Sequence, residues 1–338
     1  MRKKRNPSIR RALVAFTAAV VAGGLLTGCS SDKDGSGSPK DVSLKVGIAT
    51  QFFQIAWDEG QNRPEYRVDF SRFDGAGPVF EALGAKSIDF GFGSDLSIVS
   101  SQANGAKFKI FAVAKPNPDW LRLLVPRNSA VQSLSELKGK RIAVVRGSAA
   151  HRFVVGEIEN LGLGTDDFEL TFLSTPDAQA AFLRGDVDAW ASWEPNSAQV
   201  EIGNGARLIQ TATETTAGNI YFAANQGFFE GDRHRTDATK DFLKKFIVGL
   251  NKQKADTGNW AKVLAEKIDL PLDVATQFAK NYSFTFIPID DSVKSDYTET
   301  AKVLQEQGII KNAPDVATAF DEIANEAVIS ANGEQAAK

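Results

Sequence analysis

The fold is decided by the stretch Ser133-Leu-Ser-Glu-Leu-Lys-Gly-Lys-Arg-Ile-Ala-Val-Val-Arg-Gly-Ser-Ala149. Its first four residues form a capping box, with serine at the N-cap and glutamate three residues on, and predict a helix start. Residues 141–145 are mostly apolar and predict a buried strand. The tight loop Gly147-Ser148 then opens a helix over 149–161. Strands that alternate with helices predict an α/β protein with mostly parallel sheets covered on both faces.

A second pattern occurs twice, a helix opened by proline and followed by an apolar-Asp-apolar strand. The first copy has its helix over 78–83 and its strand over 88–93, and the second has them over 176–183 and 187–192. Proline is well tolerated near a helix start because its missing N–H would have no partner there. The offset of 99 residues is too loose for a tandem repeat. The pattern therefore predicts two α/β lobes that each use one such step.

The flanking segments predict further elements. Strands are expected over 42–49 and 66–70, and residues 51–53 read as the exit loop of the first strand. After about residue 236 the pattern predicts helices alone, over 237–252, 258–267, 271–281, 291–308 and 314–331. This helical tail must pack on a lobe and should carry little chemistry.

The N-terminal segment predicts export and a lipid anchor. Six basic residues precede an apolar stretch over 12–26, which is the order of a secretory signal peptide, residues 1–28. The apolar stretch is too short and too rich in small residues for a membrane span. Cys29 follows the cut and resembles the acylated cysteine of bacterial lipoproteins; the alternative is a spare cysteine after an ordinary signal. Residues 29–41 predict a flexible tether.

The composition excludes several classes of function. Beyond residue 28 the chain has 33 basic and 42 acidic residues, a net charge of −9, without a long basic run. This argues against a nucleic-acid partner, and any anion site must be built locally. Cys29 is the only cysteine, so we expect no disulfide, thiolate metal site or cysteine nucleophile in the domain. Two histidines argue against a multi-histidine metal site, and we expect neither metal nor cofactor.

Three loops follow a strand and open a helix: Gly93-Ser94-Asp95, Gly147-Ser148-Ala149 and Trp193-Glu194-Pro195. Ligands of open α/β sheets collect at the carboxyl ends of strands. The first N–H groups of a helix lack intrahelical partners and carry the positive end of its dipole, so they favour an anion. The alternative for each serine is that it only caps its own helix, worth about 1 kcal/mol. Three such loops in matching places favour an anion site.

Aromatic and turn residues near the same strand ends are further candidates. Phe52, Phe53 and Trp193 could form a wall for an organic group, whereas Trp190, in mid-strand, reads as core. The turn Asp74-Gly75 could present backbone N–H groups to a ligand or could simply start the next helix.

Charged residues flank the second loop. Arg146 or Arg152 could pair a sulfonate or carboxylate bidentately, with a plain surface charge as the alternative. His151 lies in the first helical turn, where capping or packing is favoured over catalysis.

These residues resemble a known family. The lipoprotein cysteine, Gly147-Ser148 with His151, residues 133–145 and residues 186–195 look like the solute-binding proteins of ABC importers, in the branch that binds aliphatic sulfonates, taurine and nitrate. The likeness covers 42–335 and is strongest over 78–200. It implies a two-lobed periplasmic-binding-protein fold of type II, with two crossover strands as the hinge. Lobe one would be 43–125 plus 213–338, and lobe two 126–212.

The resemblance also implies a ligand site. The anionic head of the ligand would meet Ser94, Gly147 and Ser148, and its body would meet Phe52, Trp193 and Glu194. The expected ligand-binding residues are Gln51, Phe52, Asp74, Gly75, Ser94, Asp95, Gly147, Ser148, Trp193 and Glu194, with no catalytic residue and with lipidation at Cys29.

The chain departs from the family in two respects. Only 14 residues separate Thr50 from Glu65, where the family has a full helix and a longer approach. Four bulky aromatic residues near the strand ends predict a ligand larger or more aromatic than taurine: Phe90, Phe92, Trp190 and Trp193.

Three hypotheses follow for function. In the first, the chain is a monomeric receptor, lipid-anchored on the extracytoplasmic face of the cell membrane, that binds a small organic anion and delivers it to an ABC permease and ATPase. In the second it is an enzyme of the same fold, either a desulfinase, which needs a cysteine nucleophile, or a pyrimidine synthase, which needs clustered histidines and cysteines. In the third it is a scaffold lipoprotein, in which Ser148→Tyr would change nothing.

Overall fold

Residues 39–60 and 63–336 are the part of the chain described by the computed structural model. They belong to one compact unit, Gly35–Lys338. The expected signal peptide 1–28, the lipidation site Cys29 and most of the tether 29–41 lie outside the described residues. Within the described part, no helix combines the length and the apolar character that crossing a membrane requires.

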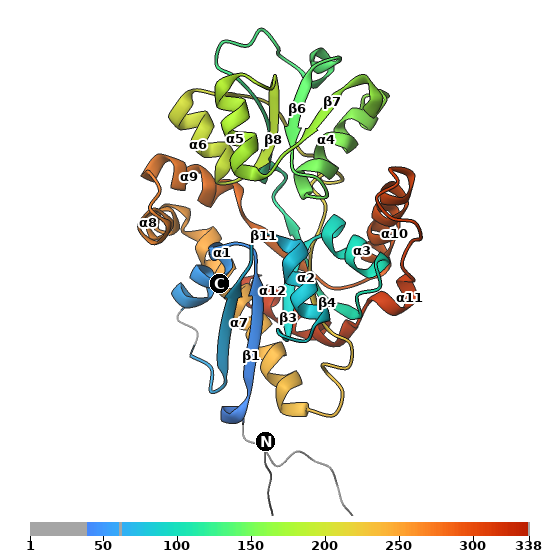
Figure 1. Cartoon of the computed structure of the whole chain (residues 1–338). Helices are drawn as coiled ribbons and strands as arrows, with labels where there is room; N and C mark the ends of the chain where they lie inside the picture. Colours follow the sequence, from blue (N-terminus) through green and yellow to red (C-terminus); the bar gives the residue numbers. More distant parts are fainter. Residues whose placement is uncertain (1–38, 61–62, 337–338) are drawn as a thin grey trace, which may run out of the picture. The chain divides into compact units, whose positions relative to one another are not determined.

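The described strands form two sheets (Figure 1). The first has the order β11-β4-β10-β3-β1-β2 and consists of β1 (Ser43–Ile48), β2 (Arg67–Arg72), β3 (Phe90–Ser94), β4 (Phe108–Pro116), β10 (Ile220–Asn225) and β11 (Phe284–Ile287). The second has the order β7-β6-β8-β5-β9 and consists of β5 (Leu121–Val125), β6 (Arg141–Val144), β7 (Glu169–Phe172), β8 (Ala189–Trp193) and β9 (Arg207–Thr211).

Both sheets are mixed, and β5 and β10 pair antiparallel for the same reason. β1 pairs in parallel with β2 and β3, as β6 does with β7 and β8. β5 and β10 run antiparallel to both of their neighbours. The chain reaches these two strands directly from the other sheet, through 117–120 and 212–219, without the helical crossover that a parallel neighbour needs. The expected α/β fold is confirmed, with mixed rather than mostly parallel sheets.

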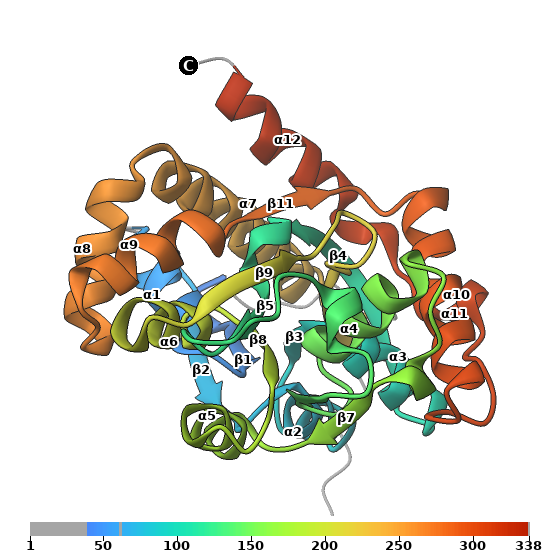
Figure 2. The same ribbon diagram turned by 90° about the horizontal axis from the view of Figure 1, so that it is seen from above.

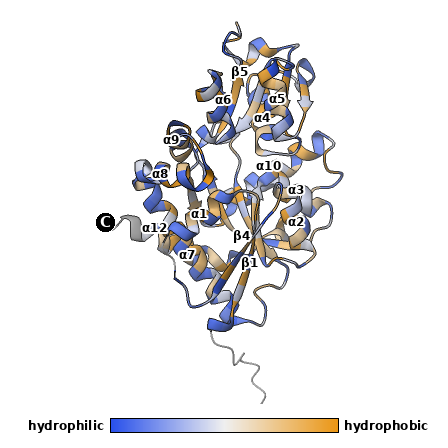
Figure 3. Ribbon diagram, turned by 60° about the vertical axis from the view of Figure 1, so that its left-hand side comes forward, coloured by the Kyte–Doolittle hydropathy of each residue, from blue (hydrophilic) through white to orange (hydrophobic). Residues whose placement is uncertain are grey.

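Helices cover both faces of each sheet (Figures 1 and 2). Contacts place α2, α3 and α10 over one face of the first sheet and α1, α7 and α12 over the other, while α4 and the pair α5 and α6 cover the second sheet. Figure 3 shows the apolar residues concentrated on strands such as β1 and β4. The helices are α1 (Gln51–Glu59), α2 (Ala76–Gly84), α3 (Asp95–Ala103), α4 (Ala149–Asn160), α5 (Thr175–Arg184), α6 (Asn196–Asn204), α7 (Arg233–Ala255), α8 (Thr257–Ile268), α9 (Leu272–Asn281), α10 (Asp291–Glu306), α11 (Val316–Ala319) and α12 (Asn325–Ala336).

Glycines bring α2 close to the first sheet. A Cβ at Gly91 would lie 2.4 Å from Val79 Cγ1, and one at Gly93 would lie 2.8 Å from the Cβ of Ala76. Both contacts are too short for real atoms, so α2 packs on bare backbone. β3 alternates phenylalanine and glycine for this reason: the rings face one core and the glycines receive the helix.

Four segments differ from the sequence-based expectation. Residues 51–53 are not an exit loop but begin α1, whose N-cap Thr50 accepts a hydrogen bond from the Phe52 N–H at 3.3 Å. The helix expected at the capping box is a single 3₁₀ turn, Leu134–Leu137. Its glutamate, Glu136, accepts from the Gln132 N–H at 3.0 Å, so the box closes before the turn and does not propagate a helix.

The C-terminal region contains a strand as well as helices. β11 pairs antiparallel with β4 and turns Phe284 and Phe286 into the core. The expected helix 314–331 divides into α11, a 3₁₀ turn and α12. Four residues are too few for the alternation of β11 to stand out beside the longer helical patterns around it.

Candidate functional site

Three expected site residues lie at the carboxyl edge of the first sheet, because β1 pairs in parallel with both β2 and β3. Gln51 is exposed in the first turn of α1, Gly75 is the N-cap of α2 and Ser94 is the N-cap of α3. Gly75 has φ 111°, and an added side chain there would meet nothing within 4 Å. The edge is therefore open beside the exposed Asp74 and the start of α2.

The corresponding edge of the second sheet carries Gly147 and Trp193, since β6 and β8 are parallel neighbours. Gly147 has φ 69° and also faces open space. Trp193 ends β8, where it is half-buried and packs against the apolar core. Its indole is the large apolar surface available at this edge.

A buried ion pair brings the two edges together. Asp95, at the start of α3, lies 3.2 Å from Arg152 of α4, and the side chains are 2% and 16% exposed. Arg152 also donates to Thr300 Oγ1 and to the Thr215 carbonyl, each at 2.9 Å. Burial raises the pKa of Asp95, and the guanidinium partly offsets that rise. Because Asp95 and Arg152 lie within a turn of Ser94 and Ser148, the N-termini of α3 and α4 lie close together.

The hydroxyl groups of Ser148 and Ser94 differ in their hydrogen bonds. Ser148 caps α4: its hydroxyl accepts from the His151 N–H at 3.3 Å and donates to the Val145 carbonyl at 2.7 Å. Ser94 makes no side-chain cap; its hydroxyl shares a 3.1 Å hydrogen bond with the Ser97 hydroxyl. The half-buried pair Ser94 and Ser97 can therefore turn a hydroxyl toward a bound anion more readily than Ser148 can.

His151 is held neutral beside the second loop. Its Nδ1 accepts from the Gly147 N–H at 3.2 Å, which leaves the proton on Nε2. Burial, and then the charge of Arg146, lower the pKa of His151 to about 4. An anion at this loop would compete with the His151 ring for the Gly147 N–H.

The two candidate arginines, Arg146 and Arg152, have different interactions. Arg152 is committed to Asp95. Arg146 is exposed, and its guanidinium carbon lies 3.6 Å from the ring centroid of Phe172 at the end of β7. No described carboxylate makes an ion pair with Arg146. Arg146 is thus a cation, placed by an aromatic ring, that is available to an anion beside Gly147.

Phe52 lies in the core. It is 2% exposed, and its ring packs against those of Trp260, Phe278, Tyr282 and Phe284 at centroid distances of 4.7–6.1 Å. In this arrangement its ring faces other aromatic rings and not the open edge.

The strand ends are less bulky than their sequence indicates. Phe90, Phe92 and Trp190 are no more than 4% exposed and belong to the apolar cores. Of the four aromatic residues expected to enlarge the ligand, Trp193 alone is half-buried. The other three therefore give no reason to expect a ligand larger than taurine.

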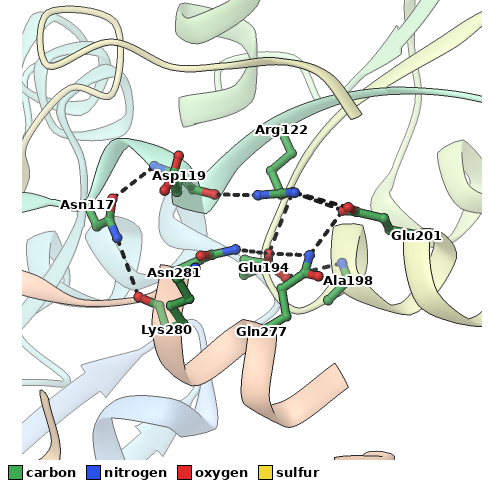
Figure 4. A network of polar contacts seen from close by, with 9 residues as sticks. All are labelled: Asn117, Asp119, Arg122, Glu194, Ala198, Glu201, Gln277, Lys280 and Asn281. Carbon is green, nitrogen blue, oxygen red and sulfur yellow. Dashed lines mark hydrogen bonds and ion pairs between the residues drawn. The ribbon is translucent and has the colours of Figure 1, made fainter. Parts of the chain in front are cut away.

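Glu194 is 1% exposed and lies in a polar network with Arg122, Gln277 and Asn281 (Figure 4). Burial raises the pKa of Glu194, and the hydrogen bonds from Asn281 and Gln277 and the charge of Arg122 partly offset that rise. Sequence reasoning missed the α9 residues, because an amide on a helix in the C-terminal region carries no signal for a partner about 80 residues earlier.

Several described cavities lie elsewhere. One of about 390 Å³ is bordered by Arg122, Gln277 and Lys280, and one of about 380 Å³ by Lys115, Glu214 and Thr285. Neither is lined by the strand-end residues. Among the described residues, no group of three His, Cys, Asp or Glu side chains is placed to hold a metal ion.

Residues 61–221 match the family described as the periplasmic substrate-binding protein of a phosphonate ABC transporter. An aliphatic sulfonates-binding protein of Escherichia coli (strain K12) is 27% identical over 259 residues, 75% of this chain and 79% of that protein. One from Bacillus subtilis (strain 168) is 26% identical over 301 residues, 87% of this chain and 89% of that protein. The chain is similar in sequence and fold to the sulfonate- and taurine-type solute-binding proteins of ABC transporters.

Solved structures agree on the fold. The alkanesulfonate-binding protein of Xanthomonas axonopodis pv. citri, bound to MOPS, is 26% identical with a TM-score of 0.73, covering 82% of this chain and 98% of that one. A desulfurization enzyme, solved as a cysteine-to-serine mutant with biphenyl-2-sulfinic acid, is 14% identical with a TM-score of 0.60, covering 86% and 99%. The enzyme shares the fold alone.

Proposed function

We propose that this solute-binding protein takes a small organic sulfonate between the facing strand ends of its two sheets and delivers it to an ABC permease and ATPase. The observation that carries the proposal is Arg146, a cation without a carboxylate partner among the described residues, held over Phe172 beside the open Gly147. The N-termini of α3 and α4 and the Ser94–Ser97 hydroxyls add donors for the oxygens of the head group. Trp193 supplies an apolar surface for the carbon chain.

The charge at the site favours a sulfonate over a phosphonate. A sulfonate carries one negative charge and accepts hydrogen bonds only, which suits one guanidinium and a set of N–H and O–H donors. A phosphonate carries a second charge or a proton that needs an acceptor. The exposed Asp74 carboxylate at the first edge would repel the second charge.

The presence of two sheets supports a proposal of two lobes that move relative to each other. Lobe one would carry the first sheet, 43–116 plus 220–338, and lobe two the second sheet, 121–211, joined by the two direct connections 117–120 and 212–219. The boundary at 125/126 expected from the sequence would separate β5 from the sheet to which it belongs. Closure of the lobes about these connections would bury the sulfonate. The protein would act as a monomer, tethered by a lipid on Cys29 to the extracytoplasmic face of the cell membrane.

Binding can be tested by thermal shift with taurine, ethanesulfonate, MOPS and ethylphosphonate. A sulfonate at 100 times its dissociation constant should stabilise the protein by about 2.7 kcal/mol. Arg146→Gln and Ser148→Tyr should remove the shift. Arg184→Gln, at the far end of α5, should retain it. No shift with any sulfonate would refute the proposal, and a larger shift with ethylphosphonate would refute the choice of ligand.

We propose binding without turnover. The desulfurization enzyme that shares the fold was solved as a cysteine mutant, whereas the only cysteine of this chain is Cys29, ahead of the domain. A thiolate nucleophile is therefore missing from the domain. Release of sulfite from biphenyl-2-sulfinate by the purified protein would overturn this conclusion.

A further inference from the structure

The carboxylate of Glu194 is enclosed by donors from two helices. Its Oε2 accepts from the Ala198 N–H of α6 at 3.2 Å. Its Oε1 accepts from Asn281 Nδ2 at 2.9 Å and from Gln277 Nε2 at 3.1 Å, both on α9 (Figure 4). A carboxylate that is 1% exposed depends on such donors, because a buried charge without them is costly.

The nearby arginine serves another carboxylate first. Arg122 of β5 makes three hydrogen bonds of 3.0–3.2 Å to Glu201 of α6, whereas its Nε is 3.8 Å from Glu194 Oε1. Gln277 also donates to Glu201, at 3.1 Å. One guanidinium thus faces two carboxylates, so the amides of α9 supply the direct hydrogen bonds to Glu194 Oε1.

This network joins parts of the molecule that the sheets keep separate. Glu194 follows β8 of the second sheet, while α9 packs on α8, which contacts the α1 and α7 helices of the first sheet. α6 and α9 lie side by side in Figures 1 and 2, on the side away from α3, α4 and α10. The hydrogen bonds of Glu194 therefore depend on the position of α9 relative to the second sheet.

Glu194 also fixes the residue before it. Its own N–H donates to the Trp120 carbonyl at 3.1 Å, and Trp193 pairs with Leu121 of β5. The backbone of 193–194 is held by β5, and the carboxylate of Glu194 anchors the turn into α6. The orientation of the half-buried Trp193 indole follows from both.

We infer that Glu194 is a positioning residue: it fastens the Trp193 turn to Asn281 and Gln277 of α9, so that Trp193 is correctly placed only when α9 is docked on the second sheet. The inference rests on the proposed function in taking Trp193 as the surface for the ligand. It gives Glu194 a role different from the direct ligand contact expected from the sequence.

An isosteric substitution tests this role. Asn281→Asp removes the amide donor to Glu194 without leaving a cavity. At about pH 8 the introduced carboxylate and that of Glu194 should both be ionised and repel each other. Acrylamide quenching of Trp193, taken as the difference from the same protein with Trp193→Phe, should then rise about twofold, and MOPS should bind about tenfold more weakly. At about pH 5 a proton shared between the introduced carboxylate and Glu194 should restore both values, with Arg122 and Glu201 as the other charged groups facing Glu194.

The matched control is Asn225→Asp, which removes an amide donor to the Ile88 carbonyl (2.8 Å) in the first sheet. It should leave Trp193 quenching unchanged. Gln277→Ala provides a second variant should Asn281→Asp not fold. Equal Trp193 quenching in Asn281→Asp and the control would overturn the inference. If the wild type binds no sulfonate, the proposed function fails, while the quenching comparison, made without ligand, still decides the role of Glu194.

Discussion

The neighbouring helix α2 leaves no room for a side chain at Gly93. A Cβ there would lie 2.8 Å from Ala76 Cβ and 2.9 Å from the Phe80 ring. Gly93→Ala should therefore destabilise the protein by about 1–3 kcal/mol in urea unfolding, because α2 must move away from β3. Gly84→Ala, at the end of the same helix, meets nothing within 4 Å and should be neutral or stabilising. Equal stabilities of the two variants would refute the close packing.

His151 should resist protonation. Its pKa of about 4 lies below its ordinary value of 6.5, so the folded state stays neutral while the unfolded chain takes up a proton. The stability this contributes is present above about pH 6.5 and lost as the pH falls toward 4, by at most about 3 kcal/mol. Two-dimensional ¹⁵N spectra should show the Nε2–H tautomer down to about pH 5. An imidazolium signal at pH 6 would contradict the contact with Gly147.

At the residue scale, the sequence predicts where site residues lie along the elements more readily than it predicts their interaction partners. Gly147, Ser148 and His151 were placed correctly in one loop and first turn, since the strand, glycine and serine signals are local. Arg152 makes an ion pair with Asp95, which lies more than 50 positions earlier in the chain, whereas Arg146 makes no ion pair with a described carboxylate. No local pattern distinguishes two arginines on either side of the same loop.

At the scale of elements, the face of α1 that carries Phe52 is part of the apolar core. Phe52→Ala should lower the free energy of unfolding by about 3–5 kcal/mol, because the ring packs among other aromatic rings. At a temperature where this variant is folded, its sulfonate affinity should match the wild type within about twofold. Gln51→Ala, its exposed neighbour, should change stability by less than about 0.5 kcal/mol. A large loss of affinity in the folded Phe52→Ala variant would place α1 at the site.

Elements with strong local signals were predicted from the sequence. Strands β1, β6 and β8 and helices α2, α4 and α5 combine apolar runs with proline, serine or glycine at their ends. α1 and β11 were missed, because both are held mainly by tertiary contacts and neither has a proline or glycine at its start as a local signal. The C-terminal helices were found, yet their polar contacts with the second sheet were not.

At the scale of the whole molecule, the Asp95–Arg152 pair should couple α3 and α4 energetically. Arg152→Met leaves Asp95 buried without its cation and should lower stability by about 3–5 kcal/mol. Asp95→Asn combined with Arg152→Met should cost less than the sum of the single changes. The exposed pair Arg184–Asp186 should show a coupling below about 1 kcal/mol in the same double-mutant cycle. Additive effects at Asp95 and Arg152 would show that the pair does not hold α3 to α4.

The place of β10 has a consequence for biosynthesis. β10 is an inner strand of the first sheet, between β3 and β4, yet the chain supplies it only after every strand of the second sheet. On the ribosome, β3 and β4 must wait with unpaired edges until residue 225 has emerged, while 121–211 already contains a complete five-stranded sheet. The first sheet thus begins first in synthesis and is completed last. The second sheet, whose strands lie between those of the first in sequence, can fold as a unit while the first sheet is still incomplete.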